Sequence, residues 1–366
     1  MVKTADWVRK LCGVLAMTTK TEVIDLLLAQ WSVLFPQVQL LAVDKDVPVG
    51  ALGARRYDLV LQVQVGDLKR ELVCEVKSLG EPRYLHQAIS ALKAGTAGYG
   101  MSAAVIAPYI SEDGRTLCRD ADINYMDLAG NIFLRFDQVL IDKTTPYKPR
   151  RGRGGKAYDV FAPVSSRVLR VLLERPHQAW KFASLSEESG VSLRTAYRVV
   201  TTLAERGYVD KKRGAITLSK PAELLDLWAE NYQVGLSSVR TYYSLERTFR
   251  AFAMQVNDLA QVDRFSYAFT LHAGASLVAP FVRFTDVHFY LDGDMDKLVE
   301  TLDLRPVEVG GTIHILQPYD AGVFYNRQEP DGLSVVCNTQ LYLDLVSYPA
   351  RGREQAEFLR REKMPY

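Results

Sequence analysis

The stretch from Ser165 to Ser219 constrains the fold more than any other part of this sequence. Within it, apolar residues recur at helical spacing in three successive runs, which are separated by prolines, glycines and a serine suited to capping. The expected elements are a helix that stops before Pro176, a helix over Phe182–Ser189, a helix from Ser192 to Gly207, and strands that begin at Tyr208 and Ala215. The stretch therefore predicts three helices followed by a two-stranded hairpin.

This order of elements is typical of a winged helix-turn-helix, in which the third helix enters the DNA major groove and the hairpin, or wing, touches the phosphate backbone. The third helix fits this role because guanidinium groups and short hydrogen-bonding groups lie opposite its apolar side. The predicted base-reading residues are Arg194, Thr195 and Arg198; the predicted phosphate contacts are Ser192, Lys211, Lys212 and Arg213; Tyr197 and Thr201 lie on the same DNA-facing side.

The distribution of charge supports a nucleic-acid partner. Residues 143–220 hold 17 Lys/Arg and 6 Asp/Glu, a net charge of +11, whereas the complete chain carries only +2, so the remainder sums to −9. Positive charge gathered in one segment of a nearly neutral protein indicates a nucleic-acid site. We therefore expect double-stranded DNA as the partner, bound without a cofactor. The alternatives are a small helical domain with a solvated polar face and a winged helix that binds protein.

At 366 residues the chain is long enough for two or three domains, each with its own core. No apolar run approaches the roughly 18–20 residues that span a bilayer, and the N-terminus lacks the pattern of a signal peptide. The four cysteines are far apart and form no metal-binding spacing, which fits small buried residues in a reducing compartment. These features predict a cytoplasmic protein without membrane contact or structural zinc.

Residues 1–142 are predicted to form an α/β domain with the order helix, antiparallel strands, helix, strand, helix and late strands. One constellation within it could perform chemistry. Asp58 starts one strand, and Glu75 and Lys77 share a face near the end of the next. If these strands pair as a hairpin, the two carboxylates meet at one end of the sheet. They could then bind Mg²⁺, with the lysine orienting a water for phosphodiester hydrolysis.

This arrangement resembles the PD-(D/E)xK restriction-endonuclease-like superfamily, whose core is a helix, strands that carry D and ExK, and a second helix. The resemblance implies Asp58, Glu75, Lys77 and Gln87 as catalytic residues, and Asp58, Glu75 and Glu22 as metal ligands. Tyr57 stands where the superfamily has its proline. The alternatives are an active Mg²⁺-dependent nuclease, a retired nuclease fold kept for shape, DNA-backbone contact or oligomerisation, and two solvated strand ends.

A basic segment over residues 143–157 divides the chain. Its prolines, glycines and mutually repelling charges predict an extended linker. Arg150, Arg151 and Arg153 could lie along phosphates or enter a minor groove, which would add strongly salt-dependent affinity. The winged helix is then expected over 158–220, and a C-terminal helical and α/β domain over 221–366.

In the C-terminal domain we expect a helix over 221–243, a second from residue 244 to about 259, and then an α/β pattern. That pattern includes a small-residue turn at 273–276 and a strand at 333–337. The acidic residues that follow this turn lack the Gly-Ser turn and the D-x-D of nucleotidyltransferases, so we expect no catalysis there. Three histidines are expected to be ordinary strand residues that ligate no metal: His272, His288 and His314.

Three segments carry a further resemblance: NYMDLAGNIFLRF (124–136), TLHAGASL (270–277) and NTQLYLDLVSYPARGREQAEFLRREK (338–363). Through them the chain, from about residue 20 to its end, resembles bacterial AbiEi-type proteins. These are the antitoxin and transcriptional-regulator component of type IV abortive-infection toxin–antitoxin systems. The resemblance implies a winged helix that binds the operator of its own operon, and a C-terminal domain used for regulation or toxin neutralisation.

The resemblance also implies a nucleotidyltransferase-like toxin as partner and leaves a homodimer open. The endonuclease-like module departs from the short N-terminal domain of many members. The sequence therefore predicts a multi-domain α/β protein with a central winged helix that acts as a DNA-binding regulator and antitoxin. The alternative is a Mg²⁺-dependent DNA endonuclease that uses Asp58, Glu75 and Lys77 and is targeted by the winged helix.

Overall fold

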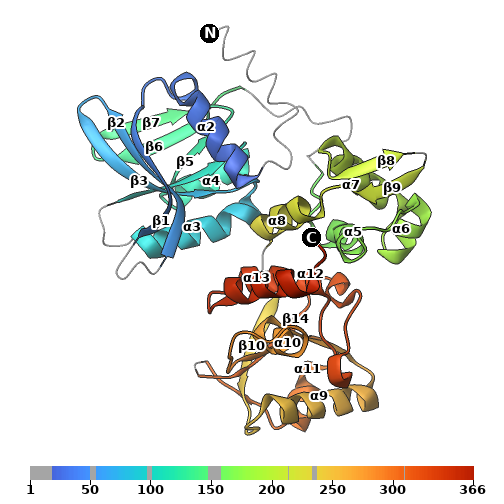
Figure 1. Ribbon diagram of the computed structural model, residues 1–366. Coiled ribbons are helices and arrows are strands. Elements are labelled where there is room, and N and C mark those ends of the chain that lie inside the picture. Colours follow the sequence, from blue (N-terminus) through green and yellow to red (C-terminus); the bar gives the residue numbers. More distant parts are fainter. Residues whose placement is uncertain are drawn as a thin grey trace. The chain divides into compact units, whose positions relative to one another are not determined.

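The computed structural model describes residues 19–49, 55–96, 101–146, 158–212, 214–232, 237–308 and 310–366. The chain divides into two compact units, residues 1–157 and 158–366 (Figure 1). This division coincides with the end of the predicted linker, most of which lies outside the described residues. The predicted winged helix and C-terminal domain both lie in the second unit.

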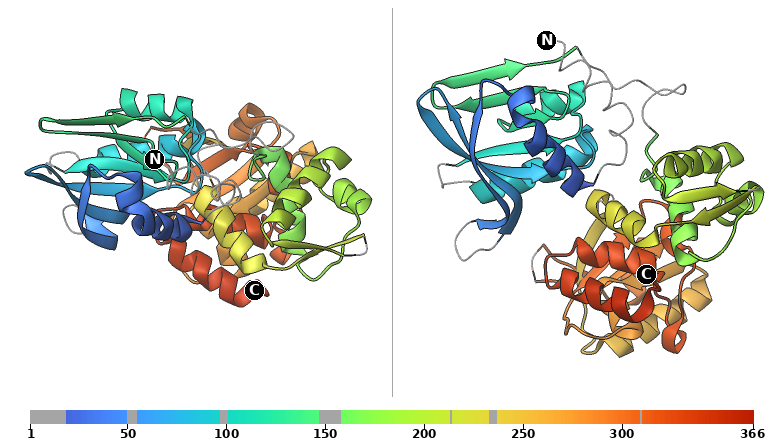
Figure 2. Two further views of the ribbon diagram at one scale, coloured as in Figure 1. Left: turned by 90° about the horizontal axis from the view of Figure 1, so that it is seen from above. Right: turned by 45° about the horizontal axis from the view of Figure 1, so that its top comes forward.

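The first unit is a seven-stranded mixed sheet with helices on both faces (Figures 1 and 2). The strands follow one another in chain order: β1 (Gln39–Val49), β2 (Arg55–Val65), β3 (Leu68–Val76), β4 (Ser102–Ala107), β5 (Asn124–Asp127), β6 (Ile132–Phe136) and β7 (Val139–Lys143). Strands β3, β4 and β5 run parallel, and the remaining pairs are antiparallel. Helix α2 (Lys20–Leu34) covers one face, and α3 (Pro82–Thr96) and α4 (Glu112–Asp120) cover the other.

Local signals in the sequence place these elements. Thr19 and Glu22 form a capping box that starts α2, with each side chain accepting from the other residue's backbone N–H. Gly66 has φ +59°, a conformation that suits glycine and permits the predicted tight turn between β2 and β3. The helix expected from residue 1 is described from Lys20 onward, and residues 1–18 lie outside the described part.

The second unit begins with the predicted helix-turn-helix and wing. Its helices are α5 (Pro163–Glu174), α6 (Phe182–Glu188) and α7 (Leu193–Glu205), and its hairpin strands are β8 (Val209–Lys212) and β9 (Ala215–Leu218). Trp180 forms an isolated antiparallel bridge with Ile216 of β9, through two backbone hydrogen bonds of 2.8 Å each. Gly190 (φ +61°) and Gly207 (φ +72°) take left-handed conformations just after α6 and α7, where the sequence predicted helix ends.

The rest of the second unit is a five-stranded sheet in the order β11-β12-β14-β10-β13, covered on both faces (Figures 1 and 2). The strands are β10 (Ser238–Tyr243), β11 (Ser266–Thr270), β12 (Val287–Asp292), β13 (Arg305–Pro306) and β14 (Ile313–Gln317). The helices are α8 (Pro221–Asn231), α9 (Phe249–Asp263), α10 (Leu271–Val278), α11 (Met295–Thr301), α12 (Asn338–Val346) and α13 (Gly352–Lys363), with short 3₁₀ turns η3 (Ala321–Phe324) and η4 (Pro330–Gly332). Phe289 of β12 meets α9 on one face, and its neighbour Tyr290 meets α12 on the other.

Three expectations for this region are corrected. Residues 238–243 form strand β10 rather than the end of a helix, because they pair with β14 and β13. The small residues 273–276 lie inside α10 rather than in a turn; a Cβ on Gly274 would lie 2.8 Å from the carbonyl oxygen of Phe269, so the small side chains permit close packing on β11. Residues 333–337 form only isolated bridges, to Phe269 and Gln328.

A buried polar network joins the winged helix to the C-terminal helices. Arg170 of α5 is fully buried, and its guanidinium donates to the side-chain oxygen of Gln340 on α12. The Gln340 amide donates to Asp344, one turn further along α12, at 2.8 Å. The Asp344 carboxylate also accepts from three other buried hydroxyl groups: Tyr232, Thr270 and Tyr290. Burial raises the pKa of Asp344, against the lowering effect of these donors.

Candidate nucleic-acid interface

Helix α7 is fixed at its start by the predicted cap. The hydroxyl of Ser192 accepts from the backbone N–H of Thr195 at 3.1 Å, and the two hydroxyl oxygens lie 2.9 Å apart. The four residues predicted to face the core are fully buried: Ala196, Val199, Val200 and Leu203. The opposite side of the helix is thereby held toward solvent in a defined orientation.

The predicted DNA-facing residues of α7 differ in their solvent exposure and in the contacts that hold their side chains. Arg194 is exposed, and no contact fixes its guanidinium within the described residues. Arg198 is half-buried, with its guanidinium carbon 4.1 Å from the ring centroid of Tyr158. The hydroxyl oxygen of Thr201 is buried and has no hydrogen-bond partner in the described part of the chain, so it does not face solvent as predicted from its position on the helix. Tyr197 is 56% exposed.

The wing places positive charge beside α7. Lys211 and Lys212 of β8 are exposed, and the ammonium of Lys211 lies 6.0 Å from the ring centroid of Tyr197. Lys212 is 3.7 Å from Asp210, a surface ion pair that contributes little to stability. Arg213, at the tip of the wing, lies outside the described residues, as do the linker residues Arg150, Arg151 and Arg153.

Sequence reasoning missed one feature of this surface. Leu193, the first residue of α7, is 56% exposed although it is a large apolar side chain. The signal was present, because Leu193 falls outside the stripe formed by Ala196, Val199, Val200 and Leu203 when the sequence is placed on a helix.

The acidic constellation of the first unit is placed as the hairpin predicts. Leu59 of β2 pairs with Cys74 of β3 at the end of the antiparallel register; Asp58 comes just before Leu59 and Glu75 just after Cys74, so both stand at this end of the hairpin. Both carboxylates raise the pKa of the Cys74 thiol, although burial is the larger cause. Glu75 is buried, and its carboxylate lies 4.0 Å from the ammonium of Lys77.

The residues predicted as metal ligands make other contacts in the structure. Asp58 accepts from the ammonium of Lys20 at 2.9 and 3.0 Å, and from the backbone N–H of Val76 at 2.7 Å. Glu22 serves in the capping box of α2, and Gln87 lies on the exposed side of α3. Tyr57, at the position of the superfamily's proline, is a core residue. Across the described ranges, no group of three or more His, Cys, Asp or Glu side chains is arranged to hold a metal ion.

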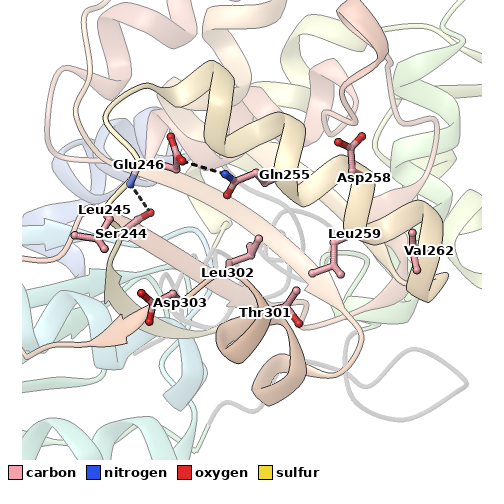
Figure 3. A pocket seen from close by; sticks show the side chains of 10 residues that line it. All are labelled: Ser244, Leu245, Glu246, Gln255, Asp258, Leu259, Val262, Thr301, Leu302 and Asp303. Atoms are coloured by element: carbon pink, nitrogen blue, oxygen red, sulfur yellow. Dashed lines mark hydrogen bonds between the residues drawn. The ribbon is translucent and has the colours of Figure 1, made fainter.

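The second unit also has a concave surface far from α7 in sequence. A cavity of about 560 Å³ is lined by α9, by residues 301–303 at the end of α11 and by residues 244–246 just after β10 (Figure 3). Three carboxylates line it, those of Glu246, Asp258 and Asp303, and its lining includes no cationic side chain. Because phosphates repel carboxylates, this surface does not suit a nucleic acid. The cationic surface around α7 is therefore the candidate nucleic-acid interface.

Two family models match this unit. Residues 217–364 match the family described as transcriptional regulator, AbiEi antitoxin, Type IV TA system. Residues 165–213 match the IclR helix-turn-helix domain, which covers α5, α6, α7 and β8. The two matches support a DNA-binding transcriptional regulator of a type IV toxin–antitoxin system, and they confirm the helix-turn-helix and the antitoxin resemblance for these residues.

Other comparisons add little. No curated protein gives a significant match to the chain. Among solved structures, the one titled "Structure of EndoMS in apo form" is similar at 18% identity with a TM-score of 0.22, and the match covers 30% of this chain and 46% of that one. None of the helices that the structure describes is long and apolar enough to cross a membrane.

Proposed function

We propose that this protein is a transcriptional regulator of the antitoxin type that binds duplex DNA with α7 in the major groove and its wing on the phosphates. The observation that carries this proposal is that α7 exposes Arg194 while its opposite side is buried in the core, and that the wing beside α7 exposes Lys211 and Lys212. A major-groove helix needs this combination, because base contacts specify a sequence whereas phosphate contacts position the protein.

In this proposal Arg194, Thr195 and Arg198 contact base edges, and Ser192 and the wing lysines hold phosphates. The ring of Tyr158 packs against the Arg198 guanidinium. Tyr158 is also the first described residue after the basic segment. Arg153 lies five residues earlier in the chain, which is at most about 18 Å of extended backbone. The length of this segment therefore allows the linker arginines to contact the same duplex as α7.

The test is a binding assay with the full-length protein and a labelled duplex that covers the region upstream of its own coding sequence. Arg194→Ala is expected to cost about 1–3 kcal/mol on the preferred sequence and to relax sequence preference, whereas Lys212→Ala should weaken binding to all duplexes alike. Exchange of the exposed Gln261 for alanine is a control far from α7 in sequence. Equal losses on every sequence for both cationic variants would contradict the assignment of roles.

The antitoxin match implies a toxin partner, and we propose a nucleotidyltransferase-like toxin, as the family resemblance suggests. Co-expression tests this idea, because the growth arrest caused by the toxin should be relieved by the full-length chain. A homodimer is part of the same proposal, since two copies would read two half-sites. Sedimentation of the protein with its duplex measures how many copies bind, and a strict one-to-one complex would contradict the dimer.

A second candidate function is a Mg²⁺-dependent endonuclease in a restriction-endonuclease-like first unit. It is favoured by Asp58 and Glu75 at one end of the β2–β3 hairpin and by Lys77, whose ammonium lies 4.0 Å from the Glu75 carboxylate. The discriminating assay incubates supercoiled plasmid with Mg²⁺ or Mn²⁺ and compares the native protein with Glu75→Ala. Cleavage that disappears in the variant would make the protein an enzyme; salt-sensitive binding without cleavage by either would leave regulation as the function.

A further inference from the structure

Two large apolar side chains remain exposed on α7, Leu193 and Tyr197, each at 56%. They are four residues apart, so they lie next to each other along one edge of the helix. A single exposed apolar residue is ordinary on a protein surface. Here, however, two of them lie one turn apart on the edge of the helix that carries Arg194, and they flank it in the sequence.

The surroundings hold this edge in place. The Tyr197 ring lies 5.4 Å from the ring of Phe182 on α6, measured between centroids, and the ammonium of Lys211 lies 6.0 Å from it on the wing side. Leu193 directly follows the Ser192 cap, so it belongs to the first turn of α7. The first turn of a recognition helix is the part that contacts base edges.

We propose that Leu193, with Tyr197 beside it, reads the C5-methyl group of thymine in the major groove; this inference rests on the proposed DNA-binding function. The thymine methyl is the apolar feature of that groove, and apolar side chains recognise it by contact rather than by hydrogen bonding. An aliphatic side chain offers no donor or acceptor, so it distinguishes thymine from cytosine by the methyl group alone. Arg194 beside it supplies the hydrogen bonds that Leu193 lacks.

The cationic neighbours of this edge favour a duplex over an uncharged protein surface. Arg194 is exposed beside Leu193, and Lys211 lies over Tyr197. A partner that covers the edge must therefore also neutralise these cations, as phosphates do. The apolar edge and its charges together fit a duplex whose thymine methyl groups line one wall of the groove.

The experiment removes the methyl group from the DNA and the side chain from the protein. The preferred sequence is first selected from a pool of random duplexes with the full-length protein. Each thymine of that sequence is then replaced singly by deoxyuracil, which lacks only the C5-methyl group, and affinity is measured by fluorescence anisotropy. At one or more positions the native protein should bind about fourfold more weakly, the effect of about one buried methylene-sized group.

The Leu193→Ala variant should bind the thymine duplex more weakly and should show no further loss with deoxyuracil at the same positions. Arg194→Ala is the matched control: it should bind more weakly overall and keep the fourfold sensitivity to deoxyuracil. The inference is overturned if the native protein is insensitive to deoxyuracil at every position, or if Leu193→Ala retains the same sensitivity. If the selection finds no preferred duplex, the proposed sequence-selective function is wrong. If it finds one but the native protein is insensitive to deoxyuracil, only the inference about Leu193 is wrong.

Discussion

Replacing Gln340 with alanine tests whether the buried network between α5 and α12 holds the winged helix on the C-terminal sheet. Gln340 is fully buried and uses both ends of its amide: the oxygen accepts from two nitrogens of Arg170, and the nitrogen donates to Asp344 at 2.8 Å and Tyr232 at 2.6 Å. No other described side chain contacts both Arg170 and Asp344 through hydrogen bonds, so the variant disconnects the buried Arg170 guanidinium from the buried Asp344 carboxyl group.

The size of the effect follows from what the variant leaves behind. The Arg170 guanidinium keeps Tyr319 and Ser166 as acceptors but loses two hydrogen bonds, and Asp344 loses one donor of four. Hydrogen bonds to charged groups contribute about 1.5–3 kcal/mol each, and Arg170 loses two of them while Tyr319 and Ser166 still accept from it, so the loss stays below the upper limit of about 6 kcal/mol. We therefore expect a loss of about 3–5 kcal/mol. In a unit of about 200 residues this lowers the melting midpoint by roughly 6–20 °C.

Differential scanning calorimetry of the full-length protein measures this shift in the transition of the second unit. The matched control is Gln261→Ala, which makes the same chemical change at an exposed position of helix α9. The control should shift the midpoint by no more than the small amount typical of surface substitutions. If the Gln340→Ala midpoint moves no further than that of the control, the buried network does not stabilise the packing of α5 against α12.

Further predictions concern pH, packing and DNA. Burial raises the pKa of Asp127 to about 6. The free energy of unfolding of the first unit should therefore be highest below pH 4 and fall by about 3 kcal/mol as the pH rises to 6. Asp127→Asn should flatten this pH dependence in urea titrations. Burial lowers the pKa of His288 to about 4, so the second unit should behave oppositely and lose about 3 kcal/mol as pH falls from 6.5 to 4, with His288→Gln as the flat control. Gly80→Ala should cost the first unit about 1–3 kcal/mol in the same assay, because the added Cβ would lie 2.2 Å from the carbonyl oxygen of Tyr109. Lys212→Ala should reduce the slope of log affinity against log salt by about one, as measured by anisotropy; an unchanged slope would remove Lys212 from the phosphate contacts.

The winged helix could be predicted from the sequence because the signals that specify it are local. Ser192 caps the helix that it precedes, and Gly190 and Gly207 stand at helix ends whose left-handed conformations favour glycine. Strand β10 shows the opposite case: the sequence predicted residues 238–243 as the end of a helix, whereas their pairing with β14, more than 70 residues later, determines that they form a strand. The candidate site divides in the same way. The positions of Arg194 and the wing lysines follow from periodicity, whereas the stacking of Arg198 on Tyr158 and the burial of the Thr201 hydroxyl depend on contacts outside the helix.

Arg170 shows why the remaining part of the fold is specified by long-range chemistry. An arginine on a helix of a DNA-binding domain is ordinarily expected at the surface, yet this one is fully buried between α5 and α12. A buried guanidinium is tolerated only where acceptors surround it, and Gln340 lies 170 residues away in the sequence. The Arg170 guanidinium therefore finds the Gln340 acceptor only when α5 packs at this position against α12. The winged helix and the C-terminal sheet consequently form one block, and a change in α12 should be transmitted to the base of the helix-turn-helix.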